Sequence, residues 1–198
     1  LTAGLTNRCT RSSEAALRAE LARENEALRA QLGVAGNRSR MLLDADVIAF
    51  DPLSFTQYAV INRGARDGVK LQMPVIMPGD VVLGKIASVH ETTADVMLIA
   101  DSENKVSAKT VSEKASGVLG GARGGALLLD LIEKSAELAV DELVVTSGLD
   151  GVYPRGLIIG TVIKVITEEE GIFQQAHLRP AYAAALPATV FVITGERE

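Results

Sequence analysis

The chain has 198 residues, of which 47% are hydrophobic and 23% are charged, a composition typical of folded globular proteins. Its formal net charge is −5, and an acidic main body argues against nucleic-acid binding, which needs a clustered basic surface. The single cysteine, Cys9, excludes an internal disulfide and a cysteine-based zinc site, and two histidines offer little for metal chemistry. We therefore expect neither a metal nor another cofactor.

The first predicted element is a helix over residues 14–34, between linkers at 1–13 and 35–44. Good helix formers dominate it, and Gly33 is placed to end it. Its apolar seam follows a four-three-four spacing and consists of Leu21, Asn25, Leu28 and Leu32. An asparagine at a core position favours two-stranded, in-register pairing. The seam predicts a short dimeric coiled coil, and the alternative is an amphipathic helix docked on its own domain.

After residue 42 the pattern changes to short β-branched runs separated by Gly, Pro, Asn and Asp. Regular turn signals between such runs predict a sandwich or barrel, and the lack of long helical patterns argues against parallel βαβ units. The predicted strands lie near 45–51, 56–62, 74–78, 80–89, 95–100, 105–111, 115–119, 125–132, 142–147, 156–167, 173–179 and 188–194.

A weak internal sequence repeat suggests a duplication. Residues 62–69 and 146–152 each combine a glycine turn with an Asp-Gly pair, and each is followed by a proline and a strand entered through glycine. We interpret this as two small β-barrel-like domains at 45–114 and 115–198, with the last strand free to pack back on the first domain. Chance similarity between turns is the alternative.

The motifs examined for chemistry do not support catalysis. His90, Asp101 and Ser147 occur in the order of a hydrolase triad, but Ser147 has no glycine two residues before it and the nucleophile elbow is absent. The glycine-rich stretch at 117–125 lacks the Gly-Lys-Ser/Thr ending of a phosphate loop. The chain is predicted not to be an enzyme.

The densest patterned segment is 146–156, which predicts a tight structural turn. Glycine supplies positive φ and proline fixes φ, so these residues set backbone geometry rather than bind a ligand. The turn residues are Gly148, Gly151, Pro154 and Gly156.

Several ordered blocks resemble the rod-shape-determining protein MreC family. Besides the helix at 17–32 they are Tyr58–Gly64, Asp67–Val69, Pro74–Ile76, Val82–Ile86, Val96–Asp101, and Val144–Leu149 running on to Gly160–Val162. The resemblance implies a non-enzymatic scaffold of the bacterial cell-elongation machinery that organises peptidoglycan synthases and self-associates as dimers or filaments. The implied partners are a penicillin-binding transpeptidase, a RodA-type polymerase, MreD and MreB.

The resemblance also implies a periplasmic or extracytoplasmic location, anchored to the cytoplasmic membrane by an N-terminal helix that would lie just before or at Leu1. Two other functions stay open: a periplasmic adaptor of an envelope transport complex, and a double-β-barrel hydrolase, which the missing nucleophile motif disfavours. We expect partner contacts at strand edges and at apolar segments such as 127–129 and 157–159. An acidic body favours a basic partner face.

Overall fold

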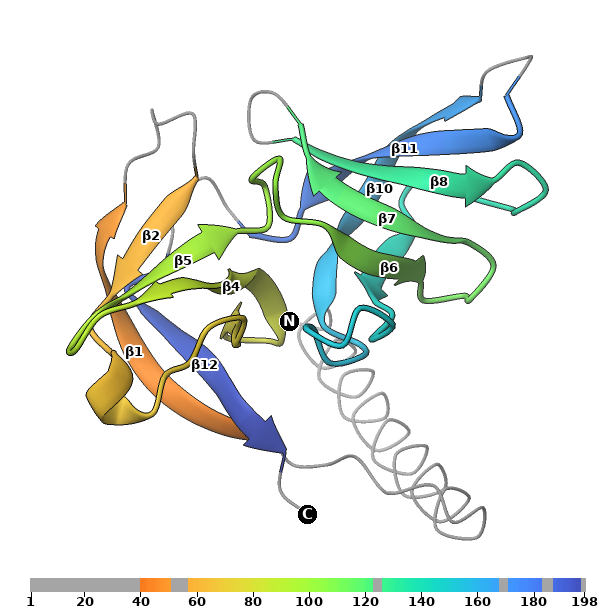
Figure 1. Ribbon diagram of the computed structural model, residues 1–198. Coiled ribbons are helices and arrows are strands. Elements are labelled where there is room, and N and C mark those ends of the chain that lie inside the picture. The colour runs from red at the N-terminus through yellow and green to blue at the C-terminus, as the bar shows by residue number, and fades with distance from the viewer. Residues whose placement is uncertain (1–39, 51–56, 123–125, 168–170, 183–186, 197–198) are drawn as a thin grey trace, which may run out of the picture. The chain divides into compact units, whose positions relative to one another are not determined.

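The structure, a computed structural model, describes residues 40–50, 57–122, 126–167, 171–182 and 187–196 (Figure 1). Its twelve strands are β1 (Arg40–Phe50), β2 (Tyr58–Ile61), β3 (Pro74–Met77), β4 (Val81–Val89), β5 (Ala94–Leu98), β6 (Val106–Thr110), β7 (Ser116–Gly121), β8 (Leu127–Glu133), β9 (Leu143–Thr146), β10 (Ile158–Thr167), β11 (Phe173–Pro180) and β12 (Thr189–Glu196). One short 3-10 turn, Ala65–Asp67, lies between β2 and β3. Each strand overlaps a strand predicted from the sequence, so the mainly β fold class is confirmed.

Alternating burial explains why these runs become strands. In β5, every second residue is buried, so one face meets the core and the other faces outward. In β8, Leu127, Leu129 and Ile132 are buried while Leu131 is exposed. This alternation corrects one expectation: the segments 127–129 and 157–159 are not exposed apolar patches, because in each segment the first and third residues are buried and only the middle one is partly accessible.

Six strands close into a barrel through the pairing order β6–β7–β8–β11–β10–β9, in which β9 pairs back with β6. The other six follow the order β4–β3–β12–β1–β2–β5, and β4 pairs with β5. Figure 1 shows β12, the last strand, beside β1, the first. The two groups are joined by a parallel pair, Ile158 with Val81.

Closed pairing removes most of the strand edges that the sequence led us to expect. Every strand in the described part has two strand neighbours in this order, and antiparallel pairing dominates. Partial edges remain among the described strands: β10 beyond Val162 pairs only with β11, and Ser88 and Val89 of β4 pair only with β5. Partner binding by strand addition along a whole edge is therefore not available to this part of the chain.

Two aliphatic clusters form the core, as expected from an aromatic content of only 4%. One is built mainly by the barrel strands and includes Leu119, Leu129 and the buried Tyr153. The other is built by β1–β5 and β12 and includes Ile61, Leu83 and Val192.

Residues 41–195 form one compact unit, and residues 1–40 with 196–198 form another, of which only Arg40 and Glu196 are among the described residues. The predicted coiled-coil helix and its seam, Leu21, Asn25, Leu28 and Leu32, lie outside the described residues. Within the described part, no helix has the length and apolarity needed to cross a bilayer.

Two strands pair across the predicted domain boundary near residue 114: β6 pairs with β7 and β9, and β12 pairs with β3. The division of the chain into two domains stays a prediction.

Candidate interaction surface

Exposed aliphatic side chains gather where β6, β9 and β10 lie side by side. Val111 directly follows β6, and its N–H donates to the carbonyl oxygen of Leu143 in β9 over 3.0 Å, which places these two residues side by side. The N–H of Asp141, which follows Val140, donates to the carbonyl oxygen of Val162, which precedes Ile163, over 2.8 Å. The exposed fractions of Val111, Val140, Leu143 and Ile163 are 56%, 56%, 37% and 47%. We call these four residues the hairpin patch, after the β6–β7 hairpin beside them.

A groove of about 630 Å³ adjoins the hairpin patch. One wall is the β6–β7 hairpin and the other is the segment before β9. The Lys114 Nζ atom lies 2.6 Å from Glu137 Oε2, and the Ser112 hydroxyl donates to the Glu142 carboxylate, so polar contacts join the walls. The groove is lined by Ser112, Lys114, Glu137, Leu138, Ala139, Val140, Asp141 and Glu142.

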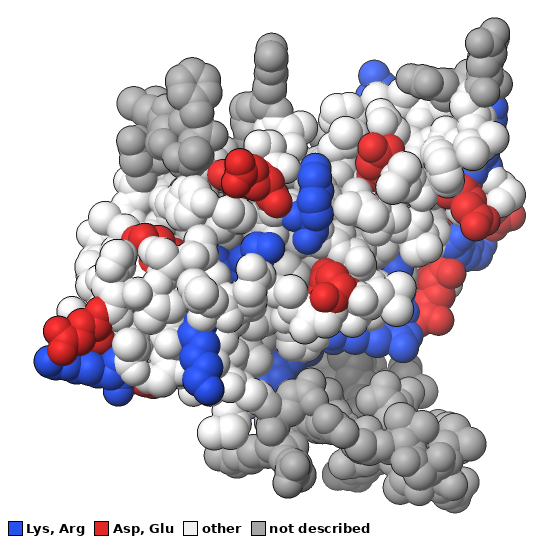
Figure 2. All heavy atoms as spheres, viewed as in Figure 1, with Lys and Arg blue, Asp and Glu red and all other residues white. Residues whose placement is uncertain are grey.

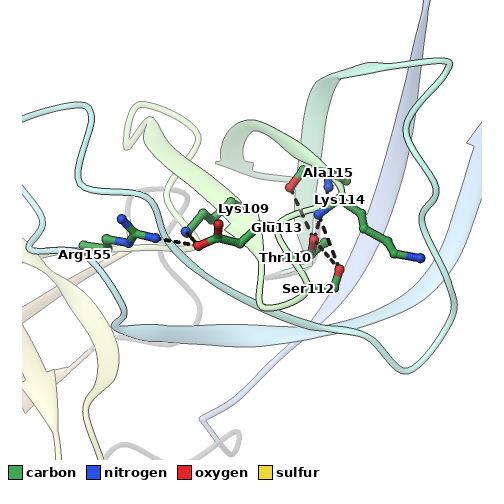
Figure 3. A network of polar contacts seen from close by, with 7 residues as sticks. All are labelled: Lys109, Thr110, Ser112, Glu113, Lys114, Ala115 and Arg155. Atoms are coloured by element: carbon green, nitrogen blue, oxygen red, sulfur yellow. Dashed lines mark hydrogen bonds and ion pairs between the residues drawn. The ribbon is translucent and has the colours of Figure 1, made fainter. Parts of the chain in front are cut away.

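Thr110 fixes the shape of the β6–β7 hairpin (Figure 3). Its N–H donates to the Ala115 carbonyl oxygen over 2.9 Å, and its hydroxyl oxygen accepts from the Ala115 N–H over 3.2 Å. The same hydroxyl lies 3.1 Å from Ser112 Oγ. Between them Glu113 adopts a left-handed φ of 62°, which few non-glycine residues adopt. The buried threonine therefore sets the geometry of an exposed turn.

Glu113 holds two cations at the hairpin. Its carboxylate accepts from Lys109 and, over 2.5 Å, from Arg155 Nη2, as Figure 3 shows. The hydrogen bond and charge of Lys109, followed by the charge of Arg155, lower the pKa of Glu113. Arg155 belongs to the predicted structural turn, so this network connects the hairpin to that turn.

The groove carries an excess of negative charge. Glu137, Asp141 and Glu142 supply three carboxylates against the one ammonium of Lys114. The hydrogen bond between Lys114 and Glu137 raises the pKa of the lysine and lowers the pKa of the glutamate, so both are charged at neutral pH. An apolar patch beside an acidic groove suits a partner face that is apolar with a basic rim.

The predicted turn residues lie together between β9 and β10. Gly148, Gly151 and Gly156 have φ values of 84°, 71° and 88°, which is the left-handed region that favours glycine. The carbonyl oxygen of Pro154 accepts from Thr146 Oγ1 over 2.5 Å, and the N–H of Gly156 donates to the Thr146 carbonyl over 2.9 Å. That these glycines are needed for stability stays a prediction.

Asp150 and Tyr153 tie this turn to the rest of the barrel. Asp150 Oδ2 accepts from the Ser107 N–H and Oδ1 accepts from the Tyr153 N–H, each over 3.0 Å. The Tyr153 ring is buried, and its hydroxyl lies 3.1 Å from Asn104 Nδ2, which also donates to the Leu98 carbonyl over 3.1 Å. Burial raises the pKa of Tyr153 far above its usual value. These contacts are all internal, as a structural turn requires.

The residues of the rejected triad do not meet. The Asp101 carboxylate accepts from the backbone N–H groups of Gln57 and Glu103. The His90 ring lies 3.3 Å from Asp95, and the Ser147 hydroxyl donates to the Ser107 carbonyl. In the part of the chain that the structure describes, no three His, Cys, Asp or Glu residues are grouped as metal ligands.

Charge is mixed rather than clustered on one face of the molecule. On the face that Figure 2 shows, acidic and basic side chains are interspersed among uncharged ones, without an extended basic patch. This face therefore lacks the clustered basic surface that is typical of nucleic-acid binding.

The comparison with protein families decides which kind of protein this is. The sequence model of "Rod shape-determining protein MreC, barrel core" matches residues 47–194. The chain belongs to the MreC family. This is a family of cell shape-determining proteins without enzymatic activity. The resemblance noted in the sequence is confirmed.

Named relatives agree with this assignment. The cell shape-determining protein MreC of Listeria monocytogenes is 34% identical over 168 residues, covering 82% of this chain and 57% of that protein. The MreC of Bacillus subtilis is 32% identical over 174 residues, covering 82% of this chain and 60% of that protein. The chain thus spans somewhat more than half the length of these curated relatives.

Solved structures of the family share the fold. An MreC structure from Listeria monocytogenes superposes with a TM-score of 0.82 at 30% identity, covering 99% of this chain and 97% of that one. A structure described as the complex between Penicillin-Binding Protein (PBP2) and MreC from Helicobacter pylori gives a TM-score of 0.64 at 17% identity, covering 79% of this chain and 99% of that one. At that identity the likeness shows the fold alone.

Proposed function

We propose that this chain is the extracytoplasmic part of a scaffold of the bacterial cell-elongation machinery and binds a penicillin-binding transpeptidase through the hairpin patch. Membership of a non-enzymatic cell-shape family supports a scaffold, because such a protein acts through the surfaces it presents. The Helicobacter pylori relative has been solved in complex with PBP2, and that complex is the analogy for the partner.

One observation carries the choice of surface: four exposed aliphatic side chains, from β9, β10 and the turns next to β6 and β9, lie beside an acidic groove. Binding energy in protein interfaces concentrates in a few apolar anchors that are surrounded by polar residues. The Glu113 network and Thr110 hold the hairpin in place, so the patch is presented on a fixed backbone and little ordering is needed on binding.

The wider assembly follows from the family resemblance. We infer that the helix at 14–34 pairs two chains through Leu21, Asn25, Leu28 and Leu32, and that a membrane helix precedes it. In this proposal the chain faces the periplasm or cell exterior, with β-barrel-like domains near 45–114 and 115–198. MreD, MreB and a RodA-type polymerase complete the assembly. One solved relative, 20% identical, is described as the major periplasmic domain from the cell shape-determining filament MreC.

The test is biolayer interferometry of the chain against the extracytoplasmic part of the elongation transpeptidase from the same organism. We expect saturable binding at micromolar or tighter affinity, which weakens as salt is added because the groove is acidic. Ile163→Glu places a charge in the hairpin patch and is expected to weaken binding at least tenfold, or about 1.4 kcal/mol.

Ile48→Glu is the matched control, because Ile48 is also an exposed strand isoleucine, at 56% against 47% for Ile163. It lies in β1 and is expected to leave binding unchanged. No binding up to about 100 μM, or equal loss in both variants, would count against the proposed surface.

A further inference from the structure

A second concave site lies on the outer side of β7 and β8. It has a volume of about 260 Å³ and is lined by Lys105, Val118, Gly120, Gly121, Leu128, Asp130 and Leu131. In the β7–β8 register Val118 pairs with Asp130 and Gly120 with Leu128. These pairs face outward, since the neighbouring pair of Leu119 with Leu129 is fully buried. We call this the β7–β8 pocket.

Gly120 lines the pocket. The atoms nearest to a Cβ at this position belong to a side chain and not to the backbone, so packing does not require a glycine here. A Cβ atom at Gly120 would come within 2.5 Å of Lys105 Nζ, the end of a flexible side chain that can move aside. At the next residue, Gly121, a Cβ atom would meet the Ala100 carbonyl oxygen at 1.8 Å. Gly121 is therefore needed for packing, whereas the space over Gly120 is covered only by the movable end of the Lys105 side chain.

Leu131 stands at the rim in a strained conformation. Asp130 and Leu131 together oppose Gln175 of β11, which is a β-bulge, and Leu131 has a φ of 57°. A left-handed leucine is rare, and bulges turn side chains out of the regular alternation. Here the bulge leaves Leu131 51% exposed beside the pocket. A strained and exposed apolar residue at a concave site is typical of a binding position.

The two charged residues of the pocket, Asp130 and Lys105, indicate which charge a ligand should carry. Asp130 Oδ1 already accepts from the Leu131 N–H over 2.7 Å and from Gln175 Nε2 over 3.1 Å. Lys105 makes no ion pair with any residue that the structure describes, and its stem lies across Gly120. The ammonium is thus available to a carboxylate that arrives with an apolar group.

We propose that the β7–β8 pocket binds a partner segment in which one large aliphatic side chain is flanked by Asp or Glu. The flanking carboxylate pairs with Lys105 and draws its side chain off Gly120, and the aliphatic group then lies on Gly120 between Leu128 and Leu131. This site differs from the hairpin patch in its elements and in its charge preference, because that patch favours a basic partner. It therefore gives the scaffold a second, acidic class of partner.

The experiment uses two capped pentapeptides as probes, acetyl-Gly-Glu-Leu-Glu-Gly-amide and acetyl-Gly-Lys-Leu-Lys-Gly-amide. Each is titrated into the ¹⁵N-labelled chain while amide chemical shifts are followed. We expect the acidic peptide to shift the amides of Gly120, Gly121 and Leu131 saturably, with a Kd of about 1 mM, and the basic peptide to bind at least tenfold more weakly. Because both ends of each peptide are capped, the only carboxylates in the acidic peptide are those of its glutamate side chains.

Gly120→Val fills the pocket and is expected to abolish the shifts. Its matched control is Gly195→Val in β12, where the nearest atom to a new Cβ is Met41 Sδ at 3.9 Å, and this variant should bind like the parent chain. Leu131→Gly should weaken binding at least fivefold while its melting temperature stays the same or rises, because glycine relieves the backbone strain. The inference is overturned if the acidic peptide produces no saturable shift up to about 10 mM, if the basic peptide binds equally well, or if Gly120→Val binds like the parent chain.

Discussion

Gly156→Val tests whether the turn between β9 and β10 depends on glycine. Gly156 has a φ of 88°, and no atom lies within 4 Å of the position that a Cβ would take. Any loss of stability must therefore come from the backbone, where a β-branched residue in the left-handed region costs about 1–3 kcal/mol. For a chain of this size each kcal/mol lowers the melting temperature by about 2–4 °C, so a fall of roughly 2–12 °C is expected.

Gly148→Val should cost more, because its Cβ would also lie 3.2 Å from Arg155 Cβ and 3.3 Å from Arg155 N. The assay is thermal unfolding followed by circular dichroism, with calorimetry to check that unfolding is two-state. Gly195→Val is the control, since that glycine has neither a left-handed φ nor close neighbours, and its cost should stay under about 0.5 kcal/mol. If Gly156→Val and Gly195→Val melt together, the turn does not depend on glycine geometry and the reasoning fails.

Three further predictions address other parts of the molecule. Tyr153→Phe removes the buried hydroxyl that meets Asn104 and should lower the free energy of unfolding in urea by about 0.5–1.5 kcal/mol; an unchanged midpoint would refute this. The lowered pKa of Glu113 means that its ion pairs stabilise the fold above the usual carboxyl pKa of 4.5 and stop doing so as the pH falls through the lower folded value. The melting temperatures of the parent chain and Glu113→Gln should therefore differ at pH 7 and converge in acid, once the pH is below the folded pKa of Glu113, and a difference that persists there would contradict this. In sedimentation the chain should form a weak dimer that deletion of residues 1–36 weakens, whereas equal dimerisation without them would place the interface in the β-structure.

The strands could be predicted from the sequence because their signals are local. Glycine, proline and Asp-Gly punctuation brackets each β-branched run, and all twelve predicted strands are present. Pairing depends on contacts between residues far apart in the sequence. Nothing local indicates that β12 joins β3 or that the pairing closes, so the sequence did not indicate that the strand edges are only partial.

The hairpin patch could not be predicted from the sequence for the same reason. Val111, Leu143 and Ile163 lie 20–52 residues apart in sequence, and only the pairing of β6, β9 and β10 brings them together. The sequence instead suggested 127–129 as an exposed apolar segment, but the alternation of the strand buries two of its three leucines. Glycines are different, because a tight turn leaves a compositional signal. The three turn glycines were found from sequence, and their φ values are left-handed.

Cell shape gives the most direct test of our proposal that the chain acts as a scaffold through the hairpin patch. The chromosomal gene would be replaced by the Leu143→Glu or the Ile48→Glu version, and cell width and protein level would be measured in each strain. The account predicts that Leu143→Glu cells lose their rod shape and widen at a normal protein level, while Ile48→Glu cells remain rods. Normal rods in both strains, or equal widening in both, would contradict the claim that the hairpin patch carries the function.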